Sequence, residues 1–251
     1  IPHAGTHVPE TIFERFTLPA KQLPDTDWHL EQLYAFAHEL GVHILIATHS
    51  RYVIDLNRAP DGQSLYPGKF TTGLCPTTLF DGSPIYKKDR EPDDKEVQER
   101  IHTYWQPYHN KLQTLIDQLK HHPRIVIFDA HSIRSQVPLL FEGVLPDLNL
   151  GTADGLSAHP ELTNRLMKYC QQSPYSVVCN GRFKGGYITR HYGQPAQGID
   201  AVQLELTQIN YMQETYPFIY ENNKANTLQL LLRKLIEALC SRWLDGPSPP
   251  L

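Results

Sequence analysis

Two kinds of apolar pattern alternate along the chain and predict its secondary structure. Short, continuous apolar runs rich in β-branched residues predict strands at residues 42–48, 125–128, 175–178 and 201–206, with part of a strand within 50–58. Continuous runs of this length are typical of strands that are buried on both faces of a sheet. Stretches with apolar residues at every third or fourth position predict helices at residues 30–40, 93–122, 162–171 and 228–243.

Glycine and proline mark where these elements end. Gly41 is suited to cap the first helix, and Pro107 is expected to kink or break the second. Irregular structure is expected at 59–93, at 138–160 and in a flexible tail at 245–251. Because loops as long as 59–93 are uncommon unless they have a function, this loop is expected to form a wall or a lid of a site.

The order of these elements predicts one α/β domain that spans residues 1–251. Helices between strands favour a mixed, mostly parallel sheet with helices on both faces. Residues 1–7 have the pattern of a strand end that runs into a glycine-containing loop. We expect most of that first strand to lie upstream of the printed numbering.

Composition narrows the range of partners. The formal charge of −4 gives no basic surface for nucleic acid or for an anionic membrane, and no apolar run approaches the roughly 20 residues of a membrane span. The chain has 4 cysteines, far apart and without CxxC spacing, which argues against a cysteine zinc site or a disulfide framework. We therefore expect a cytoplasmic protein with a small-molecule ligand, acting as a monomer or small homo-oligomer.

Polar side chains with catalytic potential follow the predicted strands. Asp129 and His131 follow the run at 125–128, His3 lies in the first segment, and Glu205 lies in the last strand. Two histidines and one carboxylate form the usual ligand set of a hydrolytic zinc site, and a further carboxylate can accept the proton of the attacking water. The alternative is that each residue is a helix cap or an ordinary hydrogen-bonding group.

Cationic residues gather in two places, near residue 55 and in the glycine-rich stretch 181–190. They are Arg51 and Arg58 with Asn57 between them, and Arg182, Lys184 and Arg190. Arginine binds carboxylates through two parallel hydrogen bonds, so both groups suit an anionic small molecule. The alternatives are surface salt bridges for the first group and a solvated turn for the second.

Eight motifs in this order resemble the N-formylglutamate deformylase (N-formylglutamate amidohydrolase) family: IPHAGT, DTDWH, SRYVIDLNR, GLCPTTLFDG, DAHSIRS, LPDLNLGT, NGRFKGGYITRHYG and QLELTQINYM. The resemblance covers essentially the whole chain. It implies a phosphorylase/hydrolase-like three-layer α/β/α sandwich and one zinc ion per chain. It also implies hydrolysis of N-formyl-L-glutamate to formate and L-glutamate, within histidine degradation. SRYVIDLNR is also similar to a stretch of aspartoacylases and, through its Asn-Arg pair, of zinc carboxypeptidases.

The resemblance also implies a metal-ligand set. His3 and His131 match the metal-binding histidines of the wider group. Carboxypeptidases and aspartoacylases have a glutamate three residues after their first histidine, where this chain has Thr6. The third ligand is therefore expected to be Asp27, with His7 and Glu10 as alternatives. A role as helix N-cap is the other interpretation of Asp27.

The remaining roles follow from the same resemblance. Glu205 matches the catalytic glutamate of the aspartoacylase-like enzymes, and Arg190 corresponds to an arginine that stabilises the oxyanion. The substrate-binding set comprises Arg51, Asn57, Arg58, Arg182 and Lys184. Two other functions stay open: hydrolysis of another N-acyl acidic amino acid, and binding of an acidic metabolite or metal without catalysis. Cobalt and manganese are alternatives to zinc at a site with nitrogen and oxygen ligands.

Overall fold

A four-stranded mixed sheet forms the centre of the molecule. The structure is a computed structural model that describes residues 1–62 and 71–241. The strands are β1 (Ile125–Ile133), β2 (Leu148–Gly151), β3 (Val177–Cys179) and β4 (Ile199–Thr207), in the order β1-β4-β2-β3. β1 is parallel to β4 and β2 is parallel to β3, whereas β2 and β4 are antiparallel.

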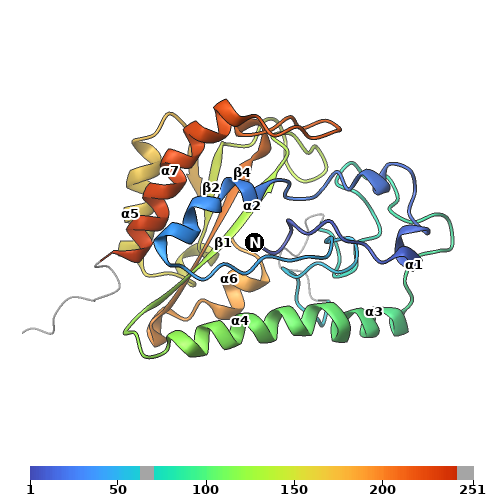
Figure 1. Cartoon of the computed structure of the whole chain (residues 1–251), viewed down its shortest axis with the longest axis horizontal. Coiled ribbons are helices and arrows are strands. Elements are labelled where there is room, and N and C mark those ends of the chain that lie inside the picture. The colour runs from blue at the N-terminus through green and yellow to red at the C-terminus, as the bar shows by residue number, and fades with distance from the viewer. Residues whose placement is uncertain (63–70, 242–251) are drawn as a thin grey trace, which may run out of the picture.

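Helices cover both faces of this sheet, so the expected three-layer α/β/α fold is confirmed (Figure 1). On one face lie α2 (Leu30–Leu33), α5 (Pro160–Gln171) and α7 (Asn222–Cys240), whose leucines share the largest apolar cluster with β2 and β4. On the other face lie α4 (Gln106–Leu119) and α6 (Tyr187–Tyr192), packed against Ile125 and Ile199. None of the helices in the described ranges has the length and apolar character needed to cross a membrane.

Short helices complete the described chain. They are α1 (Glu10–Phe13), η1 (Ala20–Gln22), η2 (Ala35–Leu40), α3 (Asp94–Arg100), η3 (Ile101–Trp105), η4 (Ala153–Gly155), η5 (Pro195–Gln197) and η6 (Gln208–Asn210). The helix expected at 30–40 is thus divided between α2 and η2, and it ends as predicted at Gly41, whose φ is 67°. Asp93 caps α3 by accepting a hydrogen bond from the Glu96 amide at 2.8 Å.

Three sequence-based predictions were wrong. Residues 42–48 and 50–58 form no regular strand: the first segment is extended and is followed by an isolated parallel bridge between His7 and His49, and the second forms turns. The region 138–160, expected to be irregular, contains β2. Pro107, expected to kink or break the helix at 93–122, lies in the first turn of α4, where its missing N–H group is not needed, and the regular α-helix is interrupted directly before it by the π-helical turn η3.

The predicted terminal helix and the predicted long loop each include residues outside the described ranges. The terminal helix begins at Asn222, earlier than predicted, and the expected end at residue 243 and the tail at 245–251 lie outside the described residues. Residues 63–70 of the long loop also lie outside them, so the lid remains a prediction. The described part of the loop does contribute Thr71, Thr72 and Phe80 to a pocket wall, as expected for a functional loop.

Candidate active site

The site is built on the carboxyl-terminal halves of two neighbouring parallel strands. In the register of β1 and β4, Asp129 lies beside Gln203 and His131 beside Glu205. Alternate residues of a strand point to the same side, so all four side chains lie on one face of the sheet. All four are buried. The sheet therefore fixes the relative positions of an imidazole and a carboxylate.

Three buried side chains converge on one point beside these strands. His3, Asp27 and His131 each offer a ligand atom, and these atoms all lie within 4.8 Å of one another. Asp27 Oδ2 lies 3.1 Å from His131 Nδ1 and 3.8 Å from His3 Nδ1. Asp27 Oδ1 is buried and has no hydrogen-bond partner among the described residues. Two imidazole nitrogens and one carboxylate, whose second oxygen is buried and without a hydrogen bond, fit the donor set of a hydrolytic zinc site.

Two further carboxylates orient the imidazole rings. Asp55 Oδ1 lies 2.7 Å from His3 Nε2, and Asp129 Oδ1 lies 3.0 Å from His131 Nε2. Both rings thus turn their Nδ1 atoms toward Asp27. Carboxylates in this position fix the tautomer of a metal-binding histidine and raise its basicity.

The charge balance at this point favours a cation. Burial by itself lowers the pKa of His131, but the negative charge of Asp129 and the hydrogen bonds from Asp129 and Asp27 outweigh burial and raise it to about 10. Burial lowers the pKa of His3, and the Arg51 charge contributes to this shift. A positive charge between the histidines, carried by an imidazolium or a bound metal ion, therefore offsets the buried carboxylates.

Asp27 is placed by its backbone and is not a helix cap. Its amide donates to the His3 carbonyl at 3.1 Å, and the N-cap position of α2 is occupied by His29. The two alternatives for the third ligand lie elsewhere. His7 is exposed and makes an edge-to-face contact with His49, with ring centroids 4.9 Å apart, and Glu10 is exposed at the start of α1.

Glu205 has the environment of a proton-transferring group. It is only 7% exposed, and burial raises its pKa to about 8. Gln203 Nε2 donates to Glu205 Oε2 at 3.3 Å, while Gln203 Oε1 accepts a hydrogen bond from the Gly186 amide at 2.8 Å. A carboxyl group whose pKa is moved toward neutrality can both accept and return a proton.

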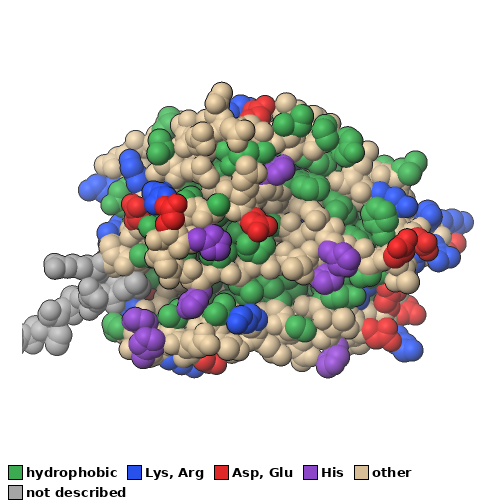
Figure 2. All heavy atoms as spheres, in the orientation of Figure 1, with side chains coloured by type: hydrophobic (Ala, Val, Ile, Leu, Met, Phe, Trp, Pro, Cys, Tyr) green, Lys and Arg blue, Asp and Glu red, His purple; other side chains and the backbone are tan. Residues whose placement is uncertain are grey.

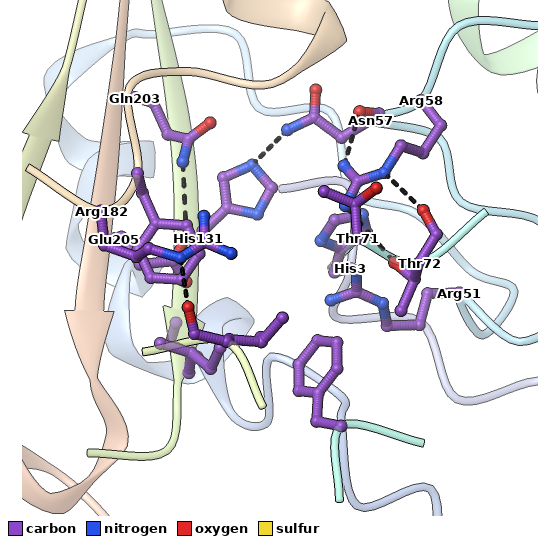
Figure 3. A pocket seen from close by; sticks show the side chains of 15 residues that line it. His3, Arg51, Asn57, Arg58, Thr71, Thr72, His131, Arg182, Gln203 and Glu205 are labelled. Atoms are coloured by element: carbon purple, nitrogen blue, oxygen red, sulfur yellow. Dashed lines mark hydrogen bonds between the residues drawn. The ribbon is translucent and has the colours of Figure 1, made fainter. Parts of the chain in front are cut away.

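Arginines and apolar side chains line the pocket above these residues (Figure 3). Arg51 donates to Asp55 at 2.7 Å and lies over the Phe80 ring at 4.9 Å. Arg58 donates to the Thr72 carbonyl at 3.1 Å. Arg182 donates to the Leu140 carbonyl and also belongs to the lining. The walls thus combine three cations with an apolar surface, as an anionic substrate with a short apolar stem requires.

Two of the expected site residues lie outside the described pocket lining, and a third lines it with its side chain already hydrogen-bonded to the protein. Lys184 pairs with Asp154 at 2.9 Å, and Arg190 Nε on α6 donates to the Gly185 carbonyl at 2.9 Å; neither belongs to the described lining. Asn57 does line the pocket. Its amide is already bound to the protein.

The contacts of Asn57 indicate a positioning role. Its Nδ2 donates to Asp129 Oδ2 at 3.1 Å and lies 2.9 Å from His131 Nε2. Its Oδ1 accepts a hydrogen bond from the Ile188 amide at 2.8 Å. Asn57 therefore joins β1 to the start of α6.

Sequence reasoning missed two residues of the site, Asp55 and Gln203. Asp55 lies within the motif that contains the arginines Arg51 and Arg58, so its proximity to them could have been noted. Gln203 precedes Glu205 by two residues and so lies on the same face of its strand. Neither position showed by itself which group it would contact.

The chain is similar to a known protein family and to curated proteins. The model of the N-formylglutamate amidohydrolase family matches residues 1–212. An N-formylglutamate deformylase from Pseudomonas putida is 48% identical over 241 residues, which cover 95% of this chain and 90% of that protein. One from Pseudomonas aeruginosa is 47% identical with the same coverage.

Two solved structures share the fold. The crystal structure of N-formylglutamate amidohydrolase from Ralstonia eutropha JMP134 has a TM-score of 0.80 at 26% identity, covering 96% of this chain and 92% of that one. A protein from Agrobacterium tumefaciens has a TM-score of 0.66 at 16% identity, covering 95% and 89%, and supports the fold alone.

Proposed function

This chain belongs to the N-formylglutamate amidohydrolase family, and we propose that it hydrolyses the amide bond of N-formyl-L-glutamate to give formate and L-glutamate. One observation carries the proposal: a buried donor set of His3, Asp27 and His131 lies beside the buried carboxyl group of Glu205. The reaction would belong to histidine degradation in the cytoplasm, as the resemblance of the sequence implies.

The donor set would hold one divalent metal ion, and zinc is the ion we propose. When bound, zinc supplies Lewis-acid chemistry by lowering the pKa of a water molecule to about 7 and polarising a carbonyl group. Asp55 and Asp129 keep the Nδ1 atoms of the two histidines directed at the site. These buried carboxylates would also strengthen the ligands by accepting hydrogen bonds from the rings.

Glu205 would transfer the proton of the reaction. Its carboxylate accepts a proton from the attacking water as oxygen bonds to the formyl carbon. It then gives that proton to the amide nitrogen as the carbon–nitrogen bond breaks, which releases the amine of glutamate. Gln203 would hold the carboxylate in place through the hydrogen bond to Oε2.

The arginines would bind the substrate carboxylates. Arg51, Arg58 and Arg182 line the described pocket, so we propose these three as the carboxylate-binding residues. Arg190 was expected to stabilise the oxyanion, and this role requires its guanidinium to reach the pocket from α6. We therefore rank Arg190 and Lys184 behind Arg182 among the cations of this segment.

The test is formate release from N-formyl-L-glutamate by the purified protein, measured before chelation, after chelation and after zinc is returned. We expect activity that chelation abolishes and zinc restores, with N-acetyl-L-glutamate as the comparison substrate. Activity that survives exhaustive metal removal would contradict the metal proposal. Hydrolysis of N-acetyl-L-glutamate in preference to the formyl compound would contradict the proposed substrate.

A further inference from the structure

Two side-chain amides, those of Asn57 and Gln203, belong to the candidate site, and one backbone segment contacts both. Asn57 Oδ1 accepts a hydrogen bond from the Ile188 amide at 2.8 Å. Gln203 Oε1 accepts one from the Gly186 amide, also at 2.8 Å. The Asn57 carbonyl accepts a further hydrogen bond from the Tyr187 amide at 3.2 Å. Residues of the site therefore satisfy three successive N–H groups where α6 begins.

These contacts decide which end of each side-chain amide faces the carboxylates of the site. A backbone N–H group can only donate, so it holds the oxygen of the amide and turns the NH2 group the other way. Asn57 Nδ2 donates to Asp129 Oδ2 at 3.1 Å. Gln203 Nε2 donates to Glu205 Oε2 at 3.3 Å. In Figure 3 the amide nitrogen of Asn57 points toward His131 and that of Gln203 points toward Glu205. The start of α6 thus selects the orientation in which both amides donate to a carboxylate.

Thr189 adds a further contact from the same segment. Its side chain is fully buried, and its Oγ1 donates to Asp129 Oδ2 at 3.3 Å. The other oxygen of that carboxylate, Oδ1, lies 3.0 Å from His131 Nε2. Thr189 therefore holds the carboxylate that orients a proposed metal ligand, without belonging to the donor set itself.

Two adjacent glycines allow this segment to approach the site so closely. A Cβ atom at Gly186 would lie 2.4 Å from Asn57 Nδ2, and one at Gly185 would lie 2.8 Å from Thr189 Cγ2. Both distances are well below the roughly 3.5 Å of ordinary contact between heavy atoms. Gly185 also has a φ of +117°, which side chains disfavour. The glycine pair in the motif NGRFKGGYITRHYG thus has a specific role beside the site.

We propose that residues 186–189 are a shared positioning element for metal binding and for proton transfer. One branch runs through Thr189 to Asp129, and the other runs through Gln203 to Glu205. Displacement of the whole segment therefore affects both steps, whereas loss of one side-chain contact affects one of them. This inference rests on the proposed function, so its test includes measurements that need no catalytic activity.

The test centres on Gly186→Ala, whose new methyl group would displace the Asn57 amide. Gly73→Ala is the matched control, because a Cβ atom at Gly73 would meet nothing within 4 Å. Thr189→Val removes the hydroxyl group of the first branch, and Thr189→Ser keeps it. Gln203→Leu removes the amide of the second branch. Each variant is measured for melting temperature, zinc affinity and kcat at saturating zinc.

Nitrogen-15 NMR of the metal-free protein follows the side-chain amide signals of Asn57 and Gln203 directly. Zinc affinity needs its own reference, because histidine side chains also lie at the surface of the molecule (Figure 2). The zinc binding assigned to the site is therefore the part that is lost in His131→Ala.

We expect Gly186→Ala to shift both side-chain amide signals, to weaken zinc binding by roughly 10- to 100-fold and to lower kcat by a similar factor. Thr189→Val should weaken zinc binding by about tenfold with little change in kcat, and Thr189→Ser should bind zinc as the original protein does. Gln203→Leu should lower kcat by about tenfold at unchanged zinc affinity.

Zinc affinity and kcat that are the same in Gly186→Ala and Gly73→Ala would overturn the proposal, even with a lower melting temperature, because the role would then be structural only. Equally weak zinc binding by Thr189→Val and Thr189→Ser would also overturn it. If Gly186→Ala does not fold, the variants at Thr189 and Gln203 decide. Absence of formate release from the original protein would instead contradict the proposed function, and the NMR signals and zinc affinities would still test the positioning by residues 186–189.

Discussion

His131 and Glu205 occupy paired positions on two adjacent parallel strands, with no loop between them to vary their separation. In the proposed reaction one holds the metal ion and the other moves the proton, so the sheet sets the distance between these two functions. Sites built on strands are held more rigidly than sites built on loops. The expected consequence is that conservative changes at either position affect catalysis much more than folding.

Glu205→Gln is the most direct test of the proton-transfer role. The glutamine keeps the size of the side chain but cannot accept the proton of the attacking water, so we expect turnover to fall by at least about 100-fold. Zinc content and melting temperature should stay close to those of the original protein, because Glu205 is not in the donor set. Turnover within a few-fold of normal would remove Glu205 from the mechanism.

Asp55→Asn tests whether the carboxylate behind His3 supports metal binding. Asp55 Oδ1 contacts His3 and its Oδ2 accepts a hydrogen bond from Arg51, both at 2.7 Å. We expect zinc affinity to fall by roughly 10- to 100-fold, as measured by competition with a chelating dye. Asp117→Asn on the exposed face of α4 is the matched control, and equal affinities in the two variants would contradict the role of Asp55.

Arg182→Gln and Lys184→Gln form a matched pair within one segment. Arg182 lines the pocket, whereas Lys184 pairs with Asp154 outside it. Loss of a charge-assisted hydrogen bond costs about 1.5–3 kcal/mol, so we expect kcat/KM for N-formyl-L-glutamate to fall by roughly 10- to 100-fold in the first variant. The second variant should differ little from the original protein. The reverse order would exchange the roles of the two residues.

We expect His109 to make the stability of the protein depend on pH. It is buried between the Tyr192 hydroxyl and the Leu56 carbonyl, each 2.9 Å away, and burial lowers its pKa to about 4. The unfolded chain binds a proton near the ordinary value of about 6.5. Stability is therefore full above that value and is lost as the pH falls from about 6.5 to about 4, by up to about 3 kcal/mol.

The measurement is the free energy of unfolding by urea at several pH values between neutral and about 4.5. We expect the His109→Gln variant to start less stable and to lose less stability across this range than the original protein. His121→Gln, at an exposed position, is the control for removal of one histidine. A slope that is the same in the original protein and in His109→Gln would show that the buried imidazole is not the source.

The sequence predicted the parts of the fold that depend on local pattern. β1, β4 and α5 were found because their apolar residues alone define a buried strand or a helical face. β2 was missed because its four residues are too short to give a pattern. Residues 42–48 were wrongly predicted as a strand, because composition indicates what suits a ladder but not whether a partner is present.

The sequence predicted some residues of the candidate site but not the contacts between them. His131 follows an apolar run and His3 lies in the predicted end of a strand, so their location at one edge of the sheet could be anticipated. Asp27 was selected by resemblance, and the structure shows a convergence that spacing could not reveal. Asp55 and Gln203 act through contacts with His3 and Gly186, across 52 and 17 positions of the sequence respectively. Such contacts exist only after the chain has folded.

The contact between Asp27 and His131 joins two parts of the chain that are synthesised at different times. The two residues are 104 positions apart, so the chain must close a long loop before their side chains meet. During synthesis on the ribosome, His3 and Asp27 appear well before His131, so the emerging segment would not yet contain the complete proposed ligand set. The proposed metal ion would therefore be captured only after residue 131 has been synthesised.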